Sequence, residues 1–166
     1  MAKWRERGAW LVAPGRILGA VVLAAGLLTA PTMVTAASQH DVVWRDHYTG
    51  FAIGGYDPVA YFVDNDARPG TDCCELEWAG VFWRFVNEGN RAAFLEAPTV
   101  YAPRFGGHDA LSVARGAFAA GDPEIWAVRN GELYFFRSAA NRAVWLMDPD
   151  AFKDTATKNW RARFPQ

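Results

Sequence analysis

Residues 80–101 read GVFWRFVNEGNRAAFLEAPTVY, and residues 131–152 read GELYFFRSAANRAVWLMDPDAF. The two stretches align without a gap at an offset of 51, with seven identities in 22 positions and with their aromatic residues in phase. Self-similarity at a fixed offset is typical of a repeated supersecondary unit. We therefore expect two copies of one structural unit.

Each copy predicts a β-hairpin followed by a short helix. In the first copy Glu75–Trp78 alternates in polarity, a turn is expected at residues 79–80, and Val81–Phe85 returns as the second strand. In the second copy Asn130-Gly131 is a strong hairpin-turn signal. A lone unit of this size would be marginally stable. The sequence therefore predicts an α+β fold in which two hairpin–helix units pack as one compact domain with an aromatic-rich core.

The helix of each copy has an expected N-cap, Asn87 in the first and Ser138 in the second. Leu95 and Leu146 are expected to join the aromatic residue before them on the buried helix face. The repeated Asn-Arg pairs at 90–91 and 141–142 are interpreted as structural.

The repeat is extended upstream by matching Asp57-Pro58 with Asp122-Pro123. This match gives the first copy 14 extra residues before its hairpin, and Cys73 and Cys74 fall in that insertion. The cysteines are therefore assigned to a variable region outside the shared scaffold. Asp57 is expected to cap a helix, because Asp caps free N–H groups and Pro suits the first turn. The stretch 105–109, Phe-Gly-Gly-His-Asp, is interpreted as the connector between the copies.

The N-terminal region has the pattern of an export signal. Basic residues precede an uncharged run from Ile17 to Ala30, and small residues follow up to Ala37. We expect residues 1–37 to be a signal peptide, cleaved after Ala36 or Ala37, and the protein to be periplasmic or secreted. The alternative is an uncleaved anchor, which would be the protein's only association with a membrane. Residues 38–50 are expected to form a leader segment anchored by Trp44 and Tyr48, before a domain spanning 51–162.

Composition bounds the function classes. Without residues 1–37 the net charge is −4, and the arginines are dispersed, which excludes a basic stripe for nucleic acid. About 130 residues are enough for one core and too few for two independent domains.

Cys73 and Cys74 are the only cysteines, and they are adjacent. Neighbouring residues on a strand point to opposite faces. One interpretation is therefore a buried thiol beside an exposed one, or a dimer bridged through Cys73 or Cys74. The other is a strained vicinal disulfide that acts as a redox switch.

Several motifs together carry a family resemblance. They are GGYDPVAYF at 54–62, WAGVFW at 78–83, NRAAF at 90–94, Pro98 with YAP at 101–103, and FGG at 105–107. The chain resembles the exported YHS-domain proteins of bacteria over about residues 51–160. The resemblance implies a metal-binding-like module, whose members are usually proposed to bind metal through cysteines.

The chain departs from similar exported members after Gly106-Gly107, where they carry Tyr and Cys and this chain carries His108 and Asp109. Replacing a thiolate by an imidazole and a carboxylate shifts any site from Cu(I) towards divalent ions such as Zn or Cu(II). The predicted metal ligands are His108 and Asp109, and the predicted ligand-binding residues are Tyr56, Asp57, His108 and Asp109. The candidates to complete a metal site are Cys73 or Cys74, His40, His47 and Asp57, since structural zinc takes four ligands. The alternative is that His108 packs on an aromatic residue and Asp109 starts the next turn.

The function expected from these features is an exported, non-enzymatic YHS-type binding module for a metal ion or a small ligand held near the junction of the two units. The alternative is a structural or protein-interaction domain that has lost metal binding. A thiol-dependent enzyme or redox protein is the third hypothesis. It is ranked last because the sequence has no recognisable nucleophile–base motif. No catalytic residue is assigned.

Overall fold

The computed structural model describes residues 42–165. The predicted signal peptide and the first residues of the predicted leader lie outside these residues. Within the described range no helix is long and apolar enough to cross a membrane.

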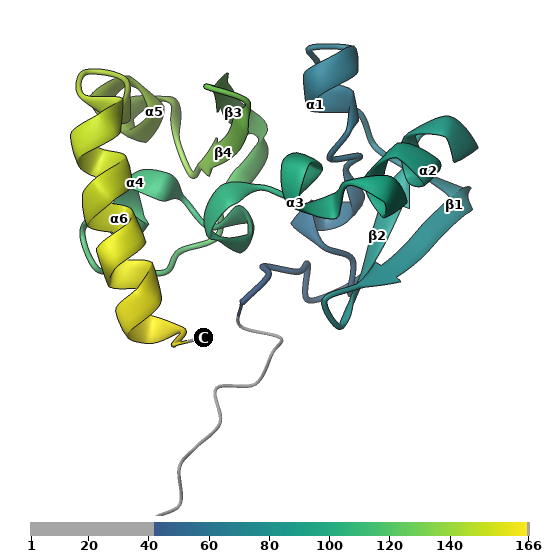
Figure 1. Ribbon diagram of the computed structural model, residues 1–166, viewed down its shortest axis with the longest axis horizontal. Helices are drawn as coiled ribbons and strands as arrows, with labels where there is room; N and C mark the ends of the chain where they lie inside the picture. The colour runs from purple at the N-terminus through teal and green to yellow at the C-terminus, as the bar shows by residue number, and fades with distance from the viewer. Residues whose placement is uncertain (1–41, 166) are drawn as a thin grey trace, which may run out of the picture. The chain divides into compact units, whose positions relative to one another are not determined.

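The same order of elements occurs twice along the chain (Figure 1). The first unit comprises a 3-10 turn η2 (Ile53–Gly55), α1 (Ala60–Val63), β1 (Thr71–Trp78), β2 (Val81–Phe85), α2 (Glu88–Glu96) and α3 (Pro98–Tyr101). The second comprises η3 (Arg104–Gly107), α4 (Ala110–Ala114), β3 (Asp122–Arg129), β4 (Glu132–Phe136), α5 (Ala139–Trp145) and α6 (Pro149–Arg163). The predicted α+β fold of two hairpin–helix units is confirmed.

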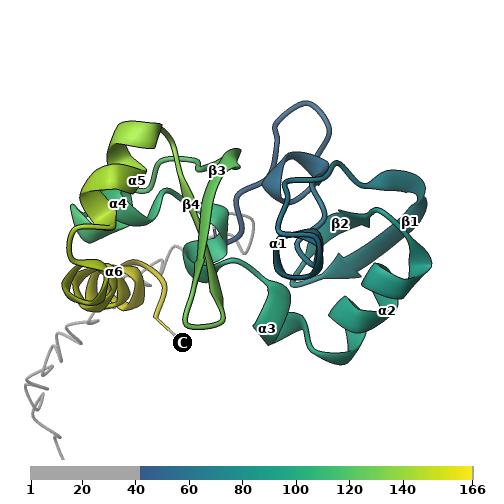
Figure 2. The same ribbon diagram turned by 90° about the horizontal axis from the view of Figure 1, so that it is seen from above.

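Each unit contains one antiparallel hairpin, β1–β2 in the first and β3–β4 in the second (Figure 2). The two hairpins have the same register. Thr71 pairs with Phe85 and Asp122 with Phe136, and in both hairpins the next pair comes only after a bulge of the first strand. Every paired position of one hairpin lies 51 residues from its counterpart. The tight turns are also alike, with positive φ at both central residues of each, as the expected hairpin turns require.

This register shows that the upstream extension of the repeat was wrong. Asp122-Pro123 begins β3 and corresponds to the start of β1, not to Asp57-Pro58. No 14-residue insertion exists, and Cys73 and Cys74 lie on a strand that the second unit also has.

The counterpart of Asp57 is instead Asp109. The backbone turns before them match, because residues 53–55 and 105–107 all have positive φ between 46° and 84°. Gly70 donates its N–H to the carbonyl of Gly55 as Gly121 does to that of Gly107. The Gly106-Gly107 turn is therefore the first element of the second unit, and its interpretation as a connector was wrong.

The helix caps form as predicted. The side chain of Asn87 accepts a hydrogen bond from the backbone N–H of Asn90 (2.9 Å), and that of Ser138 accepts one from Asn141 (3.1 Å). Phe94 and Trp145 are buried, but Leu95 and Leu146 are 60% and 43% exposed, so placing these leucines on the buried face was wrong.

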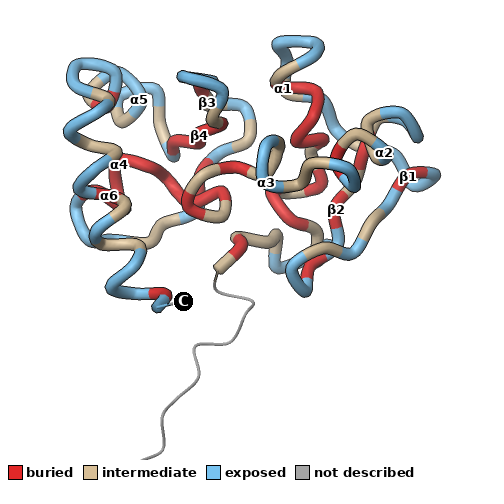
Figure 3. Tube along the Cα trace, in the orientation of Figure 1, coloured by how far each residue is buried: buried red, intermediate tan, exposed pale blue. Residues whose placement is uncertain are grey.

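The core divides into two aromatic-rich clusters, one in each unit, and β4 contributes to both. Figure 3 shows β4 as largely buried. Leu133 and Phe135 pack in the first cluster, whereas Tyr134 and Phe136 pack in the second. Side chains alternate between the two faces of a strand. β4 is therefore buried on both faces. It packs against both core clusters and joins the two units into one domain.

The described part of the leader crosses the second Gly-Gly turn. The N–H of Trp44 donates to the carbonyl of Gly106 (2.8 Å), and Val43 is buried. A Cβ on Gly106 would lie 1.7 Å from the carbonyl oxygen of Val42, so only glycine allows this close approach. Trp44 packs against the core as expected, but Tyr48 is 98% exposed and its assignment as an anchor was wrong.

Candidate functional site

The four predicted ligand-binding residues occupy equivalent places in the two units, immediately after each Gly-Gly turn. Tyr56 corresponds to His108, and Asp57 corresponds to Asp109. Of these four residues, His108 alone lines either of the two pockets described below.

The carboxylate of Asp109 is fully buried and already has its partners. One oxygen accepts from the N–H of Leu111 (3.2 Å), and the other accepts from the hydroxyl of Ser112 (2.6 Å) and the side-chain amide of Asn141. These contacts cap α4 and tie it to α5. Asp109 therefore has a structural role, and coordination of a metal would require it to give up these donors.

Asp57 has the same role in the first unit. One of its oxygens accepts from the N–H of Val59 (2.8 Å) in the turn before α1, but the N-cap of α1 is Val59 itself, so the prediction that Asp57 caps a helix was wrong. The other accepts from the N–H of Val86 (2.8 Å) and the side-chain amide of Asn90 (2.6 Å). The buried carboxylate of Asp57 therefore has its hydrogen-bond partners within the protein.

Tyr56 reaches across to the second unit. Its hydroxyl donates to a carboxylate oxygen of Glu124 on β3 (2.9 Å). Burial raises the pKa of the Tyr56 hydroxyl above its usual value, and the Glu124 carboxylate raises it further. The neighbouring hydroxyl of Tyr61 donates to the backbone carbonyl of Pro123 (2.9 Å). Both tyrosines therefore fasten the first unit to the start of β3.

Among the predicted ligand-binding residues, His108 lines a surface pocket. The residue is 7% exposed, and its Nδ1 lies 2.9 Å from the carbonyl oxygen of Phe105. The edges of Phe118 and Trp160 contact the imidazole, with ring centroids 6.4 and 5.5 Å away. The ring is thereby held in one orientation.

The hollow beside His108 has a volume of about 320 Å³, within the range of small-molecule sites. We call it the His108 pocket. It is lined by the leader residues Trp44, Arg45 and His47 and by the second-unit residues His108, Phe118, Arg163 and Phe164. Among these described lining residues there is no Asp or Glu. The pocket combines cationic groups with aromatic faces, a lining suited to an anion that has an apolar part.

A second hollow, of about 590 Å³, shares Phe164 with the His108 pocket. Its lining includes Arg104 and Arg161. The guanidinium of Arg104 lies 3.6 Å from a carboxylate oxygen of Glu132, so this charge is already partly balanced. The smaller pocket contains the predicted ligand residue His108 and is therefore the candidate site.

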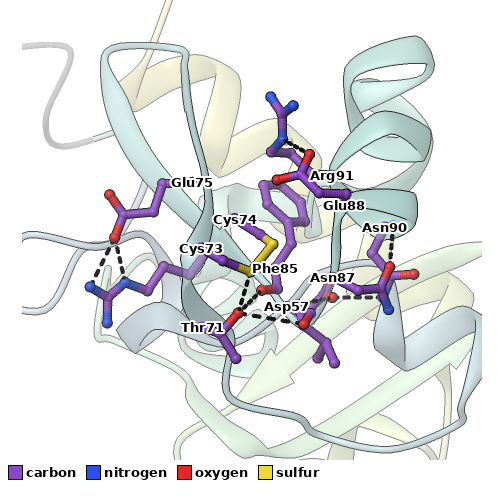
Figure 4. The surroundings of a disulfide bond; sticks show 12 residues. Asp57, Thr71, Cys73, Cys74, Glu75, Phe85, Asn87, Glu88, Asn90 and Arg91 are labelled. Atoms are coloured by element: carbon purple, nitrogen blue, oxygen red, sulfur yellow. Dashed lines mark hydrogen bonds and ion pairs between the residues drawn. A yellow bond between two sulfur atoms is a disulfide. The ribbon is translucent and has the colours of Figure 1, made fainter.

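Cys73 and Cys74 are joined in a disulfide between adjacent residues (Figure 4). Cys73 is exposed, and Cys74 is fully buried in the first core cluster. Of the two interpretations of the cysteines, the structure has the vicinal disulfide. Its action as a redox switch stays a prediction. A dimer through Cys73 or Cys74 remains a prediction that would require this bridge to open.

Within residues 42–165, no group of three or more His, Cys, Asp or Glu side chains is placed to hold a metal ion. His40, one of the candidate ligands, lies outside these residues. Metal binding through His108 and Asp109 therefore stays a prediction. No protein-family model, curated protein or solved structure matches this chain.

Sequence reasoning missed Arg45, Phe118, Arg163 and Phe164 as pocket residues. Arg163 and Phe164 lie beyond the predicted end of the domain, and α6 brings them back to the leader. The sequence signal that was present is the basic last turn of α6, which also carries Arg161.

Proposed function

We propose that this chain is a YHS-type binding module that holds a small organic anion, and that the His108 pocket is its site. The observation that carries the proposal is the lining, which has two arginines, two histidines and three aromatic residues around about 320 Å³. Guanidinium groups bind carboxylates through paired N–H donors. Trp44, Phe118 and Phe164 offer apolar faces to the rest of the ligand.

The family part of the proposal is supported by the motifs quoted above. The pocket lies between the leader and the second unit, and not at the junction of the two units where a ligand was expected. The leader supplies one wall and the second unit the other. A small ligand is favoured over a metal because Asp109 is occupied by Leu111, Ser112 and Asn141.

The test is isothermal titration calorimetry with benzoate, acetate, inorganic phosphate and benzylamine. Benzoate is expected to bind best, because it uses both the charge and the aromatic faces, and benzylamine is expected not to bind. Replacing Arg163→Gln should weaken benzoate binding about tenfold or more, the usual cost of losing a charged hydrogen bond. Arg161→Gln is the matched control, since it lies on the same helix turn but does not line the His108 pocket.

Equal effects of the two arginine substitutions, or no binding of any anion, would overturn the proposal. A parallel titration with ZnCl2 and CuCl2 tests the metal hypothesis. If metal binds, if this binding is lost in His47→Gln and His108→Gln, and if no anion binds, the ligand of the pocket is a divalent metal and the anion proposal is wrong.

The second candidate function is a structural or protein-interaction domain. The observation favouring it is that Asp57 and Asp109, the most buried charged groups of the predicted site, serve the fold. If none of the titrations shows binding, the structural or protein-interaction function is the one supported.

Export to the periplasm or the medium is part of the proposal and has its own test. Expression with residues 1–37 in place should yield a chain whose N-terminus, read by mass spectrometry, follows Ala36 or Ala37. Retention of the full sequence in the cytosol would contradict it.

A further inference from the structure

The Cys73–Cys74 bridge lies in the bulge of β1, between the paired residues Thr71 and Glu75. Its two sulfurs differ in access, because Cys73 is exposed and Cys74 has no exposed surface. The hydroxyl of Thr71 lies 3.1 Å from the Cys73 sulfur. Figure 4 shows the disulfide and the Thr71 hydroxyl that lies next to it.

The second unit provides an internal control for what the bridge does. β3 has the same bulge, and there the positions equivalent to the cysteines are Glu124 and Ile125. The bulge therefore forms without a disulfide. The bridge also closes the shortest loop that a chain allows, and so short a loop removes little entropy from the unfolded state. Neither the local geometry nor stability accounts for the pair.

Adjacency also makes the bridge reactive. The Cα atoms of Cys73 and Cys74 are 3.8 Å apart. Ordinary disulfides have Cα separations of roughly 4.4–6.8 Å, and departures from that range make the bond easier to reduce.

We propose that Cys73–Cys74 is a thiol–disulfide exchange site for an external dithiol. The thiolate of the dithiol attacks the exposed Cys73 sulfur, the bond between the two sulfurs breaks, and Cys74 leaves as a thiolate that takes up a proton. The second thiol of the reductant then attacks the mixed disulfide. It releases Cys73 as a thiol and closes the reductant's own disulfide, so two electrons and two protons pass to the cysteine pair.

The surroundings of the bridge leave the fold in place when the pair is reduced. Cys74 stays in an apolar cluster, where a thiol packs as a small hydrophobic group. Arg84 forms ion pairs with Asp72 (2.9 Å) and Glu75 (2.8 Å) on the two sides of the bridge. These contacts do not involve the sulfurs and hold the bulge in either redox state.

The test equilibrates the protein in glutathione buffers of increasing GSH to GSSG ratio, alkylates free thiols with iodoacetamide, and measures the two-carbamidomethyl fraction by mass spectrometry. We expect both cysteines to become alkylated within the range that glutathione buffers, with an unchanged circular dichroism spectrum. Structural disulfides resist the glutathione pool. A bridge that opens only with dithiothreitol in denaturant would overturn the proposal, and so would reduction that unfolds the chain.

Two single variants test the direction of attack. In Cys74→Ser the exposed Cys73 should form a mixed disulfide with GSSG at least about ten times faster than Cys74 does in Cys73→Ser, because exchange rates depend on access. Equal rates would contradict attack at Cys73. Thermal unfolding of both variants checks that each is folded, and the double variant Cys73→Ser/Cys74→Ser is the unreactive control.

Discussion

The side-chain amide of Asn141 donates a hydrogen bond to the buried carboxylate of Asp109, 32 residues earlier in the chain. In the first unit Asn90 donates in the same way to Asp57 (2.6 Å). Each bond ties the Gly-Gly turn of a unit to the helix that follows its hairpin. The asparagine of the repeated Asn-Arg pair therefore closes the unit, which explains why both copies carry it.

Replacing Asp109→Ala is expected to destabilise the protein by at least about 3 kcal/mol. The change leaves the N–H of Leu111, the hydroxyl of Ser112 and the amide of Asn141 without their acceptor in a buried place. Each unsatisfied buried donor costs about 1–3 kcal/mol. Urea unfolding followed by circular dichroism measures the free energy change.

Asp66→Ala is the control for this change, because Asp66 is exposed and should contribute within about 0.5 kcal/mol. A double-mutant cycle of Asp109→Ala with Asn141→Ala isolates the pair. If the two changes are additive, the Asp109–Asn141 bond does not carry the stability assigned to it.

Replacing Gly106→Ala is expected to detach the leader from the second unit. Its Cβ would lie 1.7 Å from the carbonyl oxygen of Val42, whereas a Cβ on the equivalent Gly54 has no neighbour closer than 3.7 Å. Both glycines have similar positive φ, 57° and 67°. Gly54→Ala therefore has the same backbone strain without the clash.

Limited trypsin digestion checks this expectation. Cleavage after Arg45 should be faster in Gly106→Ala than in Gly54→Ala, because the leader is no longer held by the hydrogen bond from Trp44. The leader also supplies part of the His108 pocket. Benzoate binding should accordingly be lost in the first variant and kept in the second, and similar behaviour of both variants would refute the steric explanation.

Glu132 predicts a pH dependence of stability. Burial alone would raise the pKa of the Glu132 carboxyl, but hydrogen bonds from Lys153 and Tyr134 and the charge of Arg104 outweigh it and lower this pKa below 4.5. A carboxyl with a lowered folded-state pKa stabilises the fold at pH values above its unfolded pKa, and this contribution is lost as the pH falls through the folded value.

Glu132→Gln should therefore destabilise the protein by about 1 kcal/mol at pH 7, as for a partly buried ion pair. The difference from the parent should shrink as the pH is lowered from about 4.5, the region in which free glutamate titrates. Urea unfolding at pH 7, 5 and 3 measures it, with the exposed Glu96→Gln as control. A difference that stays constant over this range would contradict the linkage.

The two units are expected not to fold separately. A fragment ending at Pro103 lacks Leu133 and Phe135, which complete the first core cluster, and lacks the carbonyl of Pro123 that accepts from Tyr61. Loss of two large core side chains is expected to cost more than about 4 kcal/mol, most of the stability of a small domain. Thermal circular dichroism should show no cooperative transition for this fragment, and a native-like transition would show that β4 is not needed by the first unit.

The local pattern of the sequence was sufficient for the hairpins, the helix caps and the repeat from Gly80 onward. These features depend on neighbours in the chain: alternation on strands, Asn130-Gly131 in a turn, and Asn87 or Ser138 before a helix. The same local reasoning failed at Asp57-Pro58. The identical Asp-Pro pair at 122–123 was matched with Asp57-Pro58. The true counterpart of Asp57 is Asp109, which follows the second Gly-Gly turn.

The candidate site was predicted only in part, for a related reason. His108 was recognisable as an unusual residue beside flexible glycines. Its neighbours Arg45 and Arg163 come from the leader and from the end of α6, and no sequence spacing links them. Asp109 looked like a metal ligand because its partner Asn141 lies in a helix of the second copy, and only the folded chain brings the amide to the carboxylate.

The sequence by itself determined that this protein consists of two hairpin–helix units, because strand alternation, turn chemistry and capping act over a few residues. Only the tertiary structure decided which residues of the two units correspond, how β4 divides the core, and where the cationic pocket lies. These features depend on contacts between residues far apart in the chain. Packing selects such contacts, and the local preferences of the residues do not encode them.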